Sequence, residues 1–236
     1  MHRFKDQIKQ IIFDADDTLW ENNIYYVQAS NDFFDLIEES GFPREQVVQA
    51  FDELELKVVR ERGYGSHNFV YILEELFRQF SARRKKRLNE KRFSEIIQRF
   101  TAHPVNKPNL FEQVIETLEY LKNRYHLYIL TKGEFNEQEG KIIRAGVADL
   151  VQKYFILPEK NDRAYRKLIE ENGWKPDETC MVGNSPKSDI NPALRAGMYA
   201  VYIPYTDTWK LDDEPIEDEN GKLLILERFS DLKKVF

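Results

Sequence analysis

The sequence predicts an α/β fold: a parallel sheet with helices on both faces, and an all-helical segment inserted after the first strand. Short β-rich runs alternate with helical segments through the second half of the chain, which is typical of a parallel sheet. A buried apolar run near the start stops abruptly at acidic residues. Residues 21–110 contain no clear strand, and their apolar residues recur at helical spacing.

The first predicted strand is Ile8–Phe13, and Asp14 follows it directly. The segment after it predicts four or five helices, because its apolar residues repeat every three or four positions. These residues form four groups along the chain: Phe33, Phe34 and Ile37; Val47, Phe51, Leu54 and Val58; Phe69, Ile72, Leu73, Leu76, Phe77 and Phe80; and Phe93, Ile96, Ile97 and Phe100.

The second half predicts five further strands: Tyr125–Thr131, Tyr154–Leu157, Thr179–Val182, Tyr199–Ile203 and Lys222–Leu226. Helices are expected between them, and each ends just before a glycine, a frequent helix stop. Their expected ranges are Glu134–Ala145, Arg163–Asn172 and Pro186–Ala196. The acidic segment Thr206–Gly221 contains proline and is predicted to be a surface excursion.

Composition excludes several classes of protein. A hydrophobic fraction of 42% in 236 residues excludes a disordered chain. The net charge of −6 argues against a dedicated nucleic-acid binder. The single cysteine, Cys180, cannot form an internal disulfide and favours a reducing compartment. No apolar stretch resembles a secretion signal or a membrane span, so we expect a cytoplasmic protein without membrane attachment.

Two carboxylates follow the first strand, in the sequence Asp14-Ala15-Asp16-Asp17-Thr18. The carboxyl ends of strands are where open α/β sheets bind ligands. Two nearby carboxylates disfavour joint ionisation unless a cation lies between them, and Mg²⁺ prefers such oxygen ligands. The alternative is an acidic turn in which Asp17 or Thr18 caps a helix.

Three later strand ends also offer groups that suit a phosphate or a metal. Thr131 is followed by Lys132 and Gly133. The hydroxyl of Thr131, the ammonium group of Lys132 and the main-chain amide of Gly133 could bind phosphate oxygens. Lys160 follows the third strand, and the run from Asn184 to Asp189 follows the fourth. Each alone could be an ordinary helix start or a surface residue. Four such strand ends together predict one site.

These residues, in this order, resemble the motifs of the haloacid dehalogenase superfamily. Asp14-x-Asp16-x-Thr18 is similar to its first motif, Thr131 to its second, Lys160 to its third, and Gly183-Asn184-Ser185-x-x-x-Asp189 to its fourth. The similar segments cover residues 6–20 and 111–205. The resemblance implies a Rossmann-like catalytic core of residues 1–20 and 111–236, and a helical cap domain of residues 21–110, where the family carries its cap of the first type.

The resemblance also implies roles for the residues. Asp14 would be the nucleophile that forms an aspartyl phosphate, and Asp16 the general acid and base. Thr131 and Lys160 would hold the transferring phosphoryl group, together with Lys132 and Gly133.

The implied metal is Mg²⁺, held by Asp14, by the main-chain carbonyl of Asp16 and by Asp189, with Asn184 as a weaker ligand. Many members of the family have aspartate where Asn184 stands, so one negative charge is missing and we expect weaker metal binding. Many also have glycine where Asp17 stands, so the turn must accept a side chain there. Lys132 rivals Lys160 as the lysine of the third motif.

The implied function is a Mg²⁺-dependent phosphatase acting on a small phosphate monoester, of the sugar phosphate or nucleotide class. An acid at Asp16 favours a phosphatase over a dehalogenase, because a halide leaves without a proton. One alternative is a phosphomutase, in which a second hydroxyl outcompetes water. Another is a non-catalytic binding protein that uses the basic run Arg83–Arg87, which is more simply a solvated helix end. The sequence indicates neither the natural substrate nor an oligomeric state.

Overall fold

The computed structural model describes residues 6–83, 88–102, 108–212, 214–218 and 221–236. The chain forms two compact units, Met1–Asn23 with Lys107–Phe236, and Ile24–Asn106. Four residues of the basic run, 84–87, lie outside the described residues. The boundaries of the units fall within a few residues of those expected for a core and an inserted cap. The assignment of the inserted unit as a cap stays a prediction.

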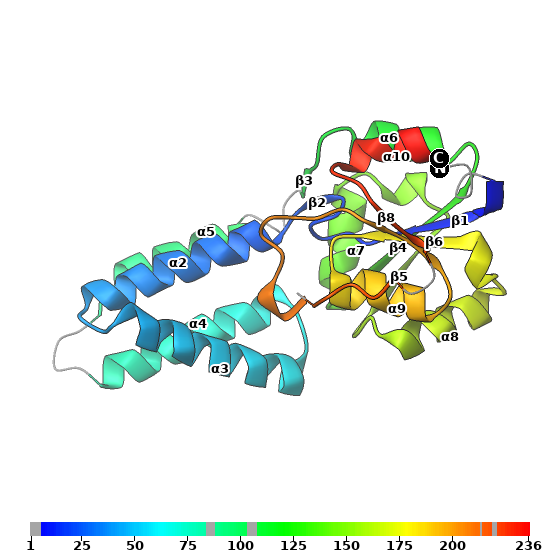
Figure 1. Cartoon of the computed structure of the whole chain (residues 1–236). Helices are drawn as coiled ribbons and strands as arrows, with labels where there is room; N and C mark the ends of the chain where they lie inside the picture. Colours follow the sequence, from blue (N-terminus) through cyan, green and yellow to red (C-terminus); the bar gives the residue numbers. More distant parts are fainter. Residues whose placement is uncertain (1–5, 84–87, 103–107, 213, 219–220) are drawn as a thin grey trace. The chain divides into compact units, whose positions relative to one another are not determined.

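The first unit is built on a six-stranded parallel sheet in the order β5-β4-β1-β6-β7-β8 (Figure 1). The order changes direction at β1, which lies between β4 and β6, and such switch points are where open α/β sheets bind ligands. The predicted Rossmann-like sheet is confirmed. Its strands are β1 Gln10–Phe13, β4 His126–Lys132, β5 Lys153–Leu157, β6 Thr179–Gly183, β7 Tyr199–Tyr202 and β8 Leu223–Ile225.

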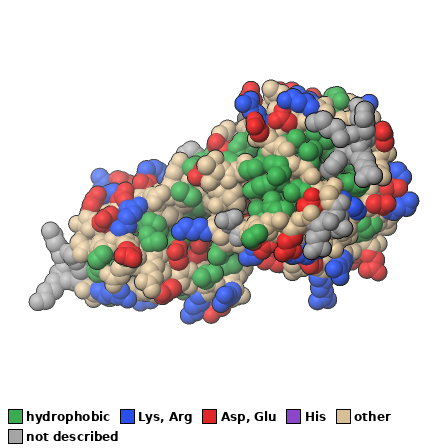
Figure 2. Space-filling view, viewed as in Figure 1, with side chains coloured by type: hydrophobic (Ala, Val, Ile, Leu, Met, Phe, Trp, Pro, Cys, Tyr) green, Lys and Arg blue, Asp and Glu red, His purple; other side chains and the backbone are tan. Residues whose placement is uncertain are grey.

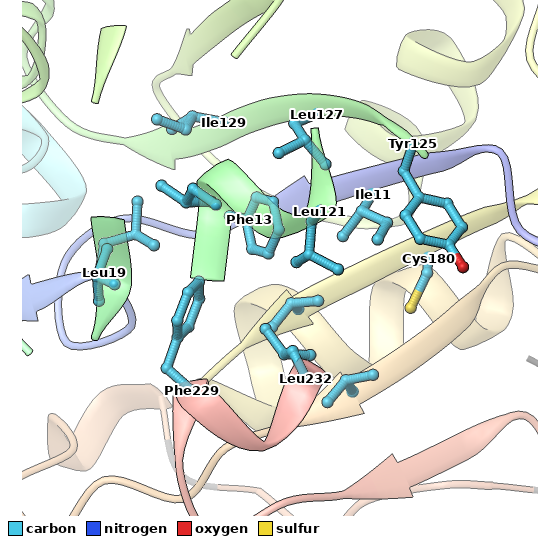
Figure 3. Close-up of a cluster of buried hydrophobic side chains, with 14 of the residues drawn as sticks. Ile11, Phe13, Leu19, Leu121, Tyr125, Leu127, Ile129, Cys180, Phe229 and Leu232 are labelled. Atoms are coloured by element: carbon cyan, nitrogen blue, oxygen red, sulfur yellow. The ribbon is translucent and has the colours of Figure 1, made fainter. Parts of the chain in front are cut away.

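Helices cover both faces of this sheet, because alternate strand residues point to opposite sides. Ile11 and Phe13 pack in one cluster with Leu121 and Leu232, as seen in Figure 3. Ile12 belongs to a second cluster, on the other face. The first face is covered by α6 (Val114–Leu121), α7 (Phe135–Arg144) and α10 (Leu232–Val235), and the second by α8 (Asp162–Asn172) and α9 (Asn191–Arg195).

The helix expected over Pro186–Ala196 is divided in two, which corrects the prediction. Residues Pro186–Ile190 form a π-helical turn, and α9 begins only at Asn191. The physical reason is Pro192, which has no N–H to donate to the carbonyl of Ser188. The hydroxyl of Tyr165 donates to that carbonyl instead, at 3.0 Å.

A short antiparallel ribbon was not expected. It pairs β2 (Trp20–Glu21) with β3 (Asn109–Leu110), at the two ends of the segment predicted to be without strands. Strands of two residues are too short to show an alternating hydropathy pattern. Single turns of 3₁₀-helix complete the first unit, at Ala148–Leu150, Pro176–Glu178, Lys210–Asp212 and Phe229–Asp231.

The second unit is helical, as its apolar spacing predicts. Within its described residues, four helices enclose one hydrophobic core: α2 Asn23–Glu39, α3 Arg44–Arg62, α4 Ser66–Ala82 and α5 Glu90–Ala102. The core is rich in aromatic side chains, and the rings of Phe69 and Phe100 lie 4.6 Å apart between centroids.

The surface mixes charges of both signs, in keeping with the composition. On the face shown in Figure 2, lysine and arginine side chains are interspersed with aspartate and glutamate. In the part of the chain that the structure describes, no helix is long and apolar enough to cross a membrane. Cys180 lies buried in β6, with the packing of a small core residue.

Candidate active site

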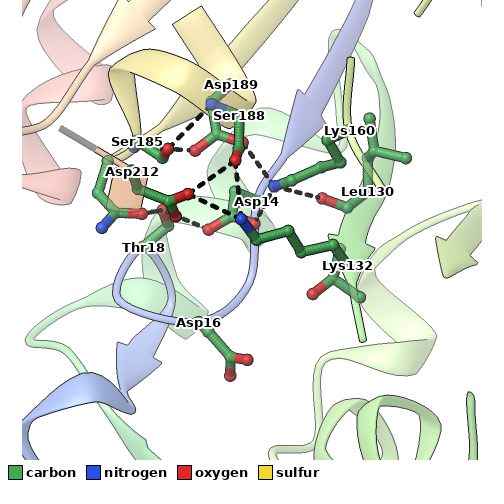
Figure 4. A network of polar contacts seen from close by, with 12 residues as sticks. Asp14, Asp16, Thr18, Leu130, Lys132, Lys160, Ser185, Ser188, Asp189 and Asp212 are labelled. Carbon is green, nitrogen blue, oxygen red and sulfur yellow. Dashed lines mark hydrogen bonds and ion pairs between the residues drawn. The ribbon is translucent and has the colours of Figure 1, made fainter. Parts of the chain in front are cut away.

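Three strand ends bring charged side chains together at the switch point of the sheet. The Nζ atom of Lys160 lies 2.5 Å from Oδ1 of Asp14 and 2.5 Å from Oδ1 of Asp189 (Figure 4). All three residues are buried. The cluster therefore joins two carboxylates and one ammonium group from the loops after β1, β5 and β6.

Burial and the neighbouring charges together set the pKa values of this cluster. Burial raises the pKa of Asp14 to about 7; the charge of Asp189 adds to this effect and Lys160 opposes it. Burial likewise raises the pKa of Asp189, again against Lys160. Burial alone would lower the pKa of Lys160, but the two carboxylates outweigh it and hold this pKa well above its usual value. Lys160 is therefore the fixed positive charge of the site.

Of the two candidate lysines, Lys160 contacts Asp14 directly. The ammonium group of Lys132 donates to the hydroxyl of Ser188 at 2.9 Å and pairs with Asp212 at 2.8 Å. This geometry favours Lys160 as the counterpart of the family's third-motif lysine. Lys132 instead connects the end of β4 to the segment that follows β7.

Thr18 connects the first and fourth motifs. Its hydroxyl lies 3.0 Å from Oδ2 of Asp14 and 3.2 Å from Oδ1 of Asn184. A hydroxyl has one hydrogen and can donate to only one of these oxygens at a time. The other oxygen then lacks this hydrogen bond and can accept from another donor or bind a cation.

Asp189 is placed by the π-helical turn. Its Oδ2 accepts from the main-chain N–H of Ser185 at 3.0 Å. It also packs against Gly183, where an added Cβ would lie 2.3 Å from the same oxygen. The glycine that ends β6 is therefore needed for Asp189 to approach.

The turn after β1 accepts Asp17 in the left-handed region, with φ 61°. The carboxylate of Asp17 accepts from the main-chain N–H groups of Asn22 and Asn23, at 2.8 and 3.0 Å. Burial raises the pKa of Asp17 to about 8. The departure from glycine at this position thus supplies a cap for the start of α2.

Asp16 does not join the cluster around Asp14. Figure 4 shows its carboxylate directed away from Asp14 and Lys160. It accepts from Nε1 of Trp20 at 2.7 Å, and from Gln138 and Lys141 of α7. The side chain is 22% exposed, so one side of it remains accessible.

Thr131 lies at the end of β4, where its hydroxyl accepts from Nε2 of Gln138 at 2.6 Å. The hydrogen of that hydroxyl is then available to an oxygen of a bound phosphate. Gly133 adopts φ 147°, and an added Cβ would lie 3.0 Å from the side chain of Gln138. The role of Gly133 here is to let Gln138 approach the strand end.

Sequence reasoning missed Gln138, Lys141 and Asp212. A signal for the first two was present, because they share the buried face of α7 with Ile142. Polar residues on a buried helix face need partners, and these two find Asp16. Asp212 lies in the acidic excursion, where nothing in the pattern distinguishes it from its neighbours.

The donors present are compatible with Mg²⁺. The carboxylates of Asp14 and Asp189 and the amide oxygen of Asn184 are buried hard ligands, and the hydroxyl of Thr18 lies within hydrogen-bond distance of both Asp14 and Asn184. Among the described residues, no group of three or more His, Cys, Asp or Glu side chains is placed to hold a metal. A site here would therefore depend on two carboxylates, one amide and the main-chain carbonyl of Asp16.

Comparison with known proteins connects this geometry to a family. The sequence model for haloacid dehalogenase-like hydrolases matches residues 8–197, which is most of the chain and includes every residue of the four motifs. The chain belongs to this family. It is an enzyme, a haloacid dehalogenase-like hydrolase, which sets aside the alternative of a non-catalytic binding protein.

Relatives of this haloacid dehalogenase-like hydrolase include two named glyceraldehyde 3-phosphate phosphatase. The protein of Methanothermobacter thermautotrophicus is 25% identical over 97% of this chain and 99% of its own length. That of Pyrococcus furiosus is 29% identical over 88% of this chain and 85% of its own. A solved haloacid dehalogenase-like hydrolase from Xanthomonas campestris has the same fold, with a TM-score of 0.79 at 24% identity, over 97% of this chain and 94% of that one.

Proposed function

We propose that this hydrolase is a Mg²⁺-dependent phosphatase that cleaves small phosphate monoesters through an aspartyl phosphate. The observation that carries the proposal is the pair Asp14 and Asp16. One carboxylate lies against the buried lysine of the site, and the other lies apart from it on an accessible side. A dehalogenase does not need an acid at Asp16, because a halide leaves without a proton. A phosphatase needs one, because its alkoxide leaving group must be protonated.

In the first step, a carboxylate oxygen of Asp14 attacks phosphorus while the bond from phosphorus to the ester oxygen breaks. The ester oxygen takes a proton from Asp16 and leaves as an alcohol. Lys160 and the hydroxyl of Thr131 hold the phosphoryl oxygens, where charge develops in the transition state.

In the second step, water attacks the phosphorus of the aspartyl phosphate. Asp16, now ionised, takes the proton of that water. The bond between phosphorus and Asp14 breaks, and inorganic phosphate leaves. Mg²⁺, held by Asp14, Asp189, Asn184 and the main-chain carbonyl of Asp16, would reduce the repulsion between the nucleophile and the anionic phosphate.

For the substrate we propose a short sugar phosphate, ahead of a nucleotide. The support is the name of two relatives, which are called glyceraldehyde 3-phosphate phosphatases and align along 97% and 88% of this chain. A phosphate ester of three to six carbons is the first group of compounds to test.

The test measures hydrolysis of 4-nitrophenyl phosphate and of a panel of sugar phosphates and nucleotides, with Mg²⁺ and with EDTA. Wild type is compared with Asp14→Asn and Asp16→Asn. We expect metal-dependent turnover of wild type, no turnover of Asp14→Asn, and a loss of roughly 10²–10⁴-fold in Asp16→Asn on the sugar phosphates. Turnover that survives Asp14→Asn, or that needs no metal, would contradict the proposal.

A further inference from the structure

Asp16 is surrounded by hydrogen-bond donors that the reaction proposed above does not use. Lys141 donates from Nζ to Oδ1 and Oδ2 of Asp16, both at 3.1 Å, and Gln138 donates from Nε2 to Oδ2 at 3.0 Å. Trp20 donates to Oδ1 at 2.7 Å. A carboxylate held from both of its oxygens has a single orientation.

Lys141 is an unusual residue for its position. Its side chain is only 2% exposed, on the helix face that packs against the sheet. A buried ammonium group is unfavourable unless it is paired and hydrogen-bonded. Its polar partners are Asp16, Oδ1 of Asn22 at 2.9 Å and the carboxylate of Glu137 at 3.5 Å. Asp16 is the partner whose two oxygens it meets equally.

Gln138 connects Asp16 to the phosphate-binding strand end. The same Nε2 atom that donates to Asp16 also donates to the hydroxyl of Thr131, at 2.6 Å. An added Cβ at Gly133 would lie 3.0 Å from the side chain of Gln138, so the glycine leaves room for Gln138 to contact Thr131. One amide nitrogen therefore lies between the candidate acid and a candidate phosphate ligand.

This arrangement agrees with the geometry of phosphoryl transfer. The attacking and leaving oxygens lie in line on opposite sides of phosphorus, so the acid must be held about one phosphoryl group away from the nucleophile. Gln138 donates to both Asp16 and Thr131, so the candidate acid lies near a candidate phosphate ligand and apart from Asp14 (Figure 4). A fixed position is worth more to a general acid than a mobile one.

We infer that Lys141 and Gln138 are positioning residues, which hold the carboxylate of Asp16 on the leaving-group side of the phosphoryl site. The inference rests on the proposed phosphatase function and adds two residues of α7 to its machinery. Neither residue needs to touch the substrate. Their effect should depend on how much help the leaving group needs.

The test compares two esters on Lys141→Met and Gln138→Met. One is 4-nitrophenyl phosphate, whose phenolate leaves without a proton, and the other is the sugar phosphate that wild type hydrolyses fastest. The ratio kcat/KM reports the steps up to formation of the aspartyl phosphate, where Asp16 acts as the acid. We expect kcat/KM to fall roughly tenfold or more for the sugar phosphate, and less than about threefold for the aryl ester.

The matched control is Lys222→Met. Lys222 is also a partly buried lysine with a main-chain acceptor, the carbonyl of Gly197 at 2.7 Å, but it lies immediately before β8, away from the strand ends that carry the site. We expect it to leave both esters unchanged. If Lys141→Met fails to fold, Gln138→Met alone decides, because it replaces one uncharged side chain by another.

Equal losses on the two esters in the folded variants, or no loss on either, would overturn the inference. Failure of the underlying function looks different, since it would appear as turnover that persists in Asp14→Asn. A leaving-group-dependent loss in both α7 variants, with Asp14→Asn inactive, supports the two proposals together.

Discussion

Gly183 ends β6 at the point where Asp189 packs against it. In Gly183→Ala the new Cβ would lie 2.3 Å from a carboxylate oxygen, so Asp189 or the strand end must move. We expect kcat to fall by at least about tenfold, because displacements on the order of 1 Å in a catalytic site have large effects. Steady-state kinetics and thermal unfolding would measure the change. Gly173→Ala is the control for a loss of stability without a clash: nothing lies within 4 Å of its added carbon, and its strain comes from a positive φ that Gly183 does not share.

Asn184 contributes a neutral oxygen where many relatives of its family carry a charge. We expect Asn184→Asp to bind Mg²⁺ more tightly, on the order of tenfold, because the number of charged ligands sets affinity for hard cations. The variant should also be less stable than wild type in EDTA, since it buries a third carboxylate beside Asp14 and Asp189. Calorimetric titration gives both dissociation constants. Equal affinities would contradict the prediction.

Asp14 should make Mg²⁺ binding depend on pH. Burial raises its pKa to about 7 in the metal-free protein, so below that pH the carboxyl is mostly protonated and a cation must displace the proton. Affinity should therefore rise as pH increases, and weaken roughly tenfold from pH 8 to pH 6. Titration at both values, with Asp14→Asn as the control, measures this. An affinity that does not change, or that weakens as pH increases, would show that Asp14 does not carry the effect.

At the level of single elements, the π-helical turn depends on Tyr165. Its hydroxyl donates to the carbonyl of Ser188, to which Pro192 cannot donate because proline has no N–H. Tyr165→Phe removes this hydrogen-bond donor from a buried carbonyl, and we expect a loss of about 1–3 kcal/mol in the free energy of unfolding. Urea unfolding measures the loss. Tyr128→Phe, whose hydroxyl bonds an exposed side chain, should cost less than half as much.

The strands of the sheet were predictable because each is a short β-rich run, and the central strands β1, β4 and β6 are also largely buried. The helical insertion was predictable from the spacing of residues such as Phe69 and Phe80. The π-helical turn was not, because it arises from Pro192 together with Tyr165, a residue of a different helix. Contacts between distant segments leave no local pattern.

The same limit applies to the site. Asp14, Thr131, Lys160 and Asp189 follow strand ends, and parallel strands bring such positions together. The direction in which Asp16 points depends on Gln138 and Lys141, more than 120 positions away along the chain. Only the fold shows that these residues meet.

At the level of the whole molecule, each unit has its own hydrophobic core. Among the described residues, Phe33 belongs to the core cluster of the helical unit and Phe13 to that of the sheet unit. We expect Phe33→Ala to destabilise the helical unit by about 3–5 kcal/mol while the sheet unit keeps its stability. Hydrogen exchange, followed separately in each unit, would measure this. Phe13→Ala is the reciprocal control, and equal loss of protection in both units after Phe33→Ala would mean that they unfold as one.

The two-residue ribbon of β2 and β3 has a consequence for how this chain can change over time. Trp20 pairs with Leu110 and Glu21 with Asn109, so the chain leaves the sheet unit and re-enters it at adjacent points. Topologically, everything between is the loop of a hairpin. Loops tolerate replacement when their ends are already held close, because the entropy of closing them changes slowly with length. The hairpin is thus an insertion site. Recombination could replace the helical segment there with one of another length and sequence, while the strand order of the sheet stays unchanged.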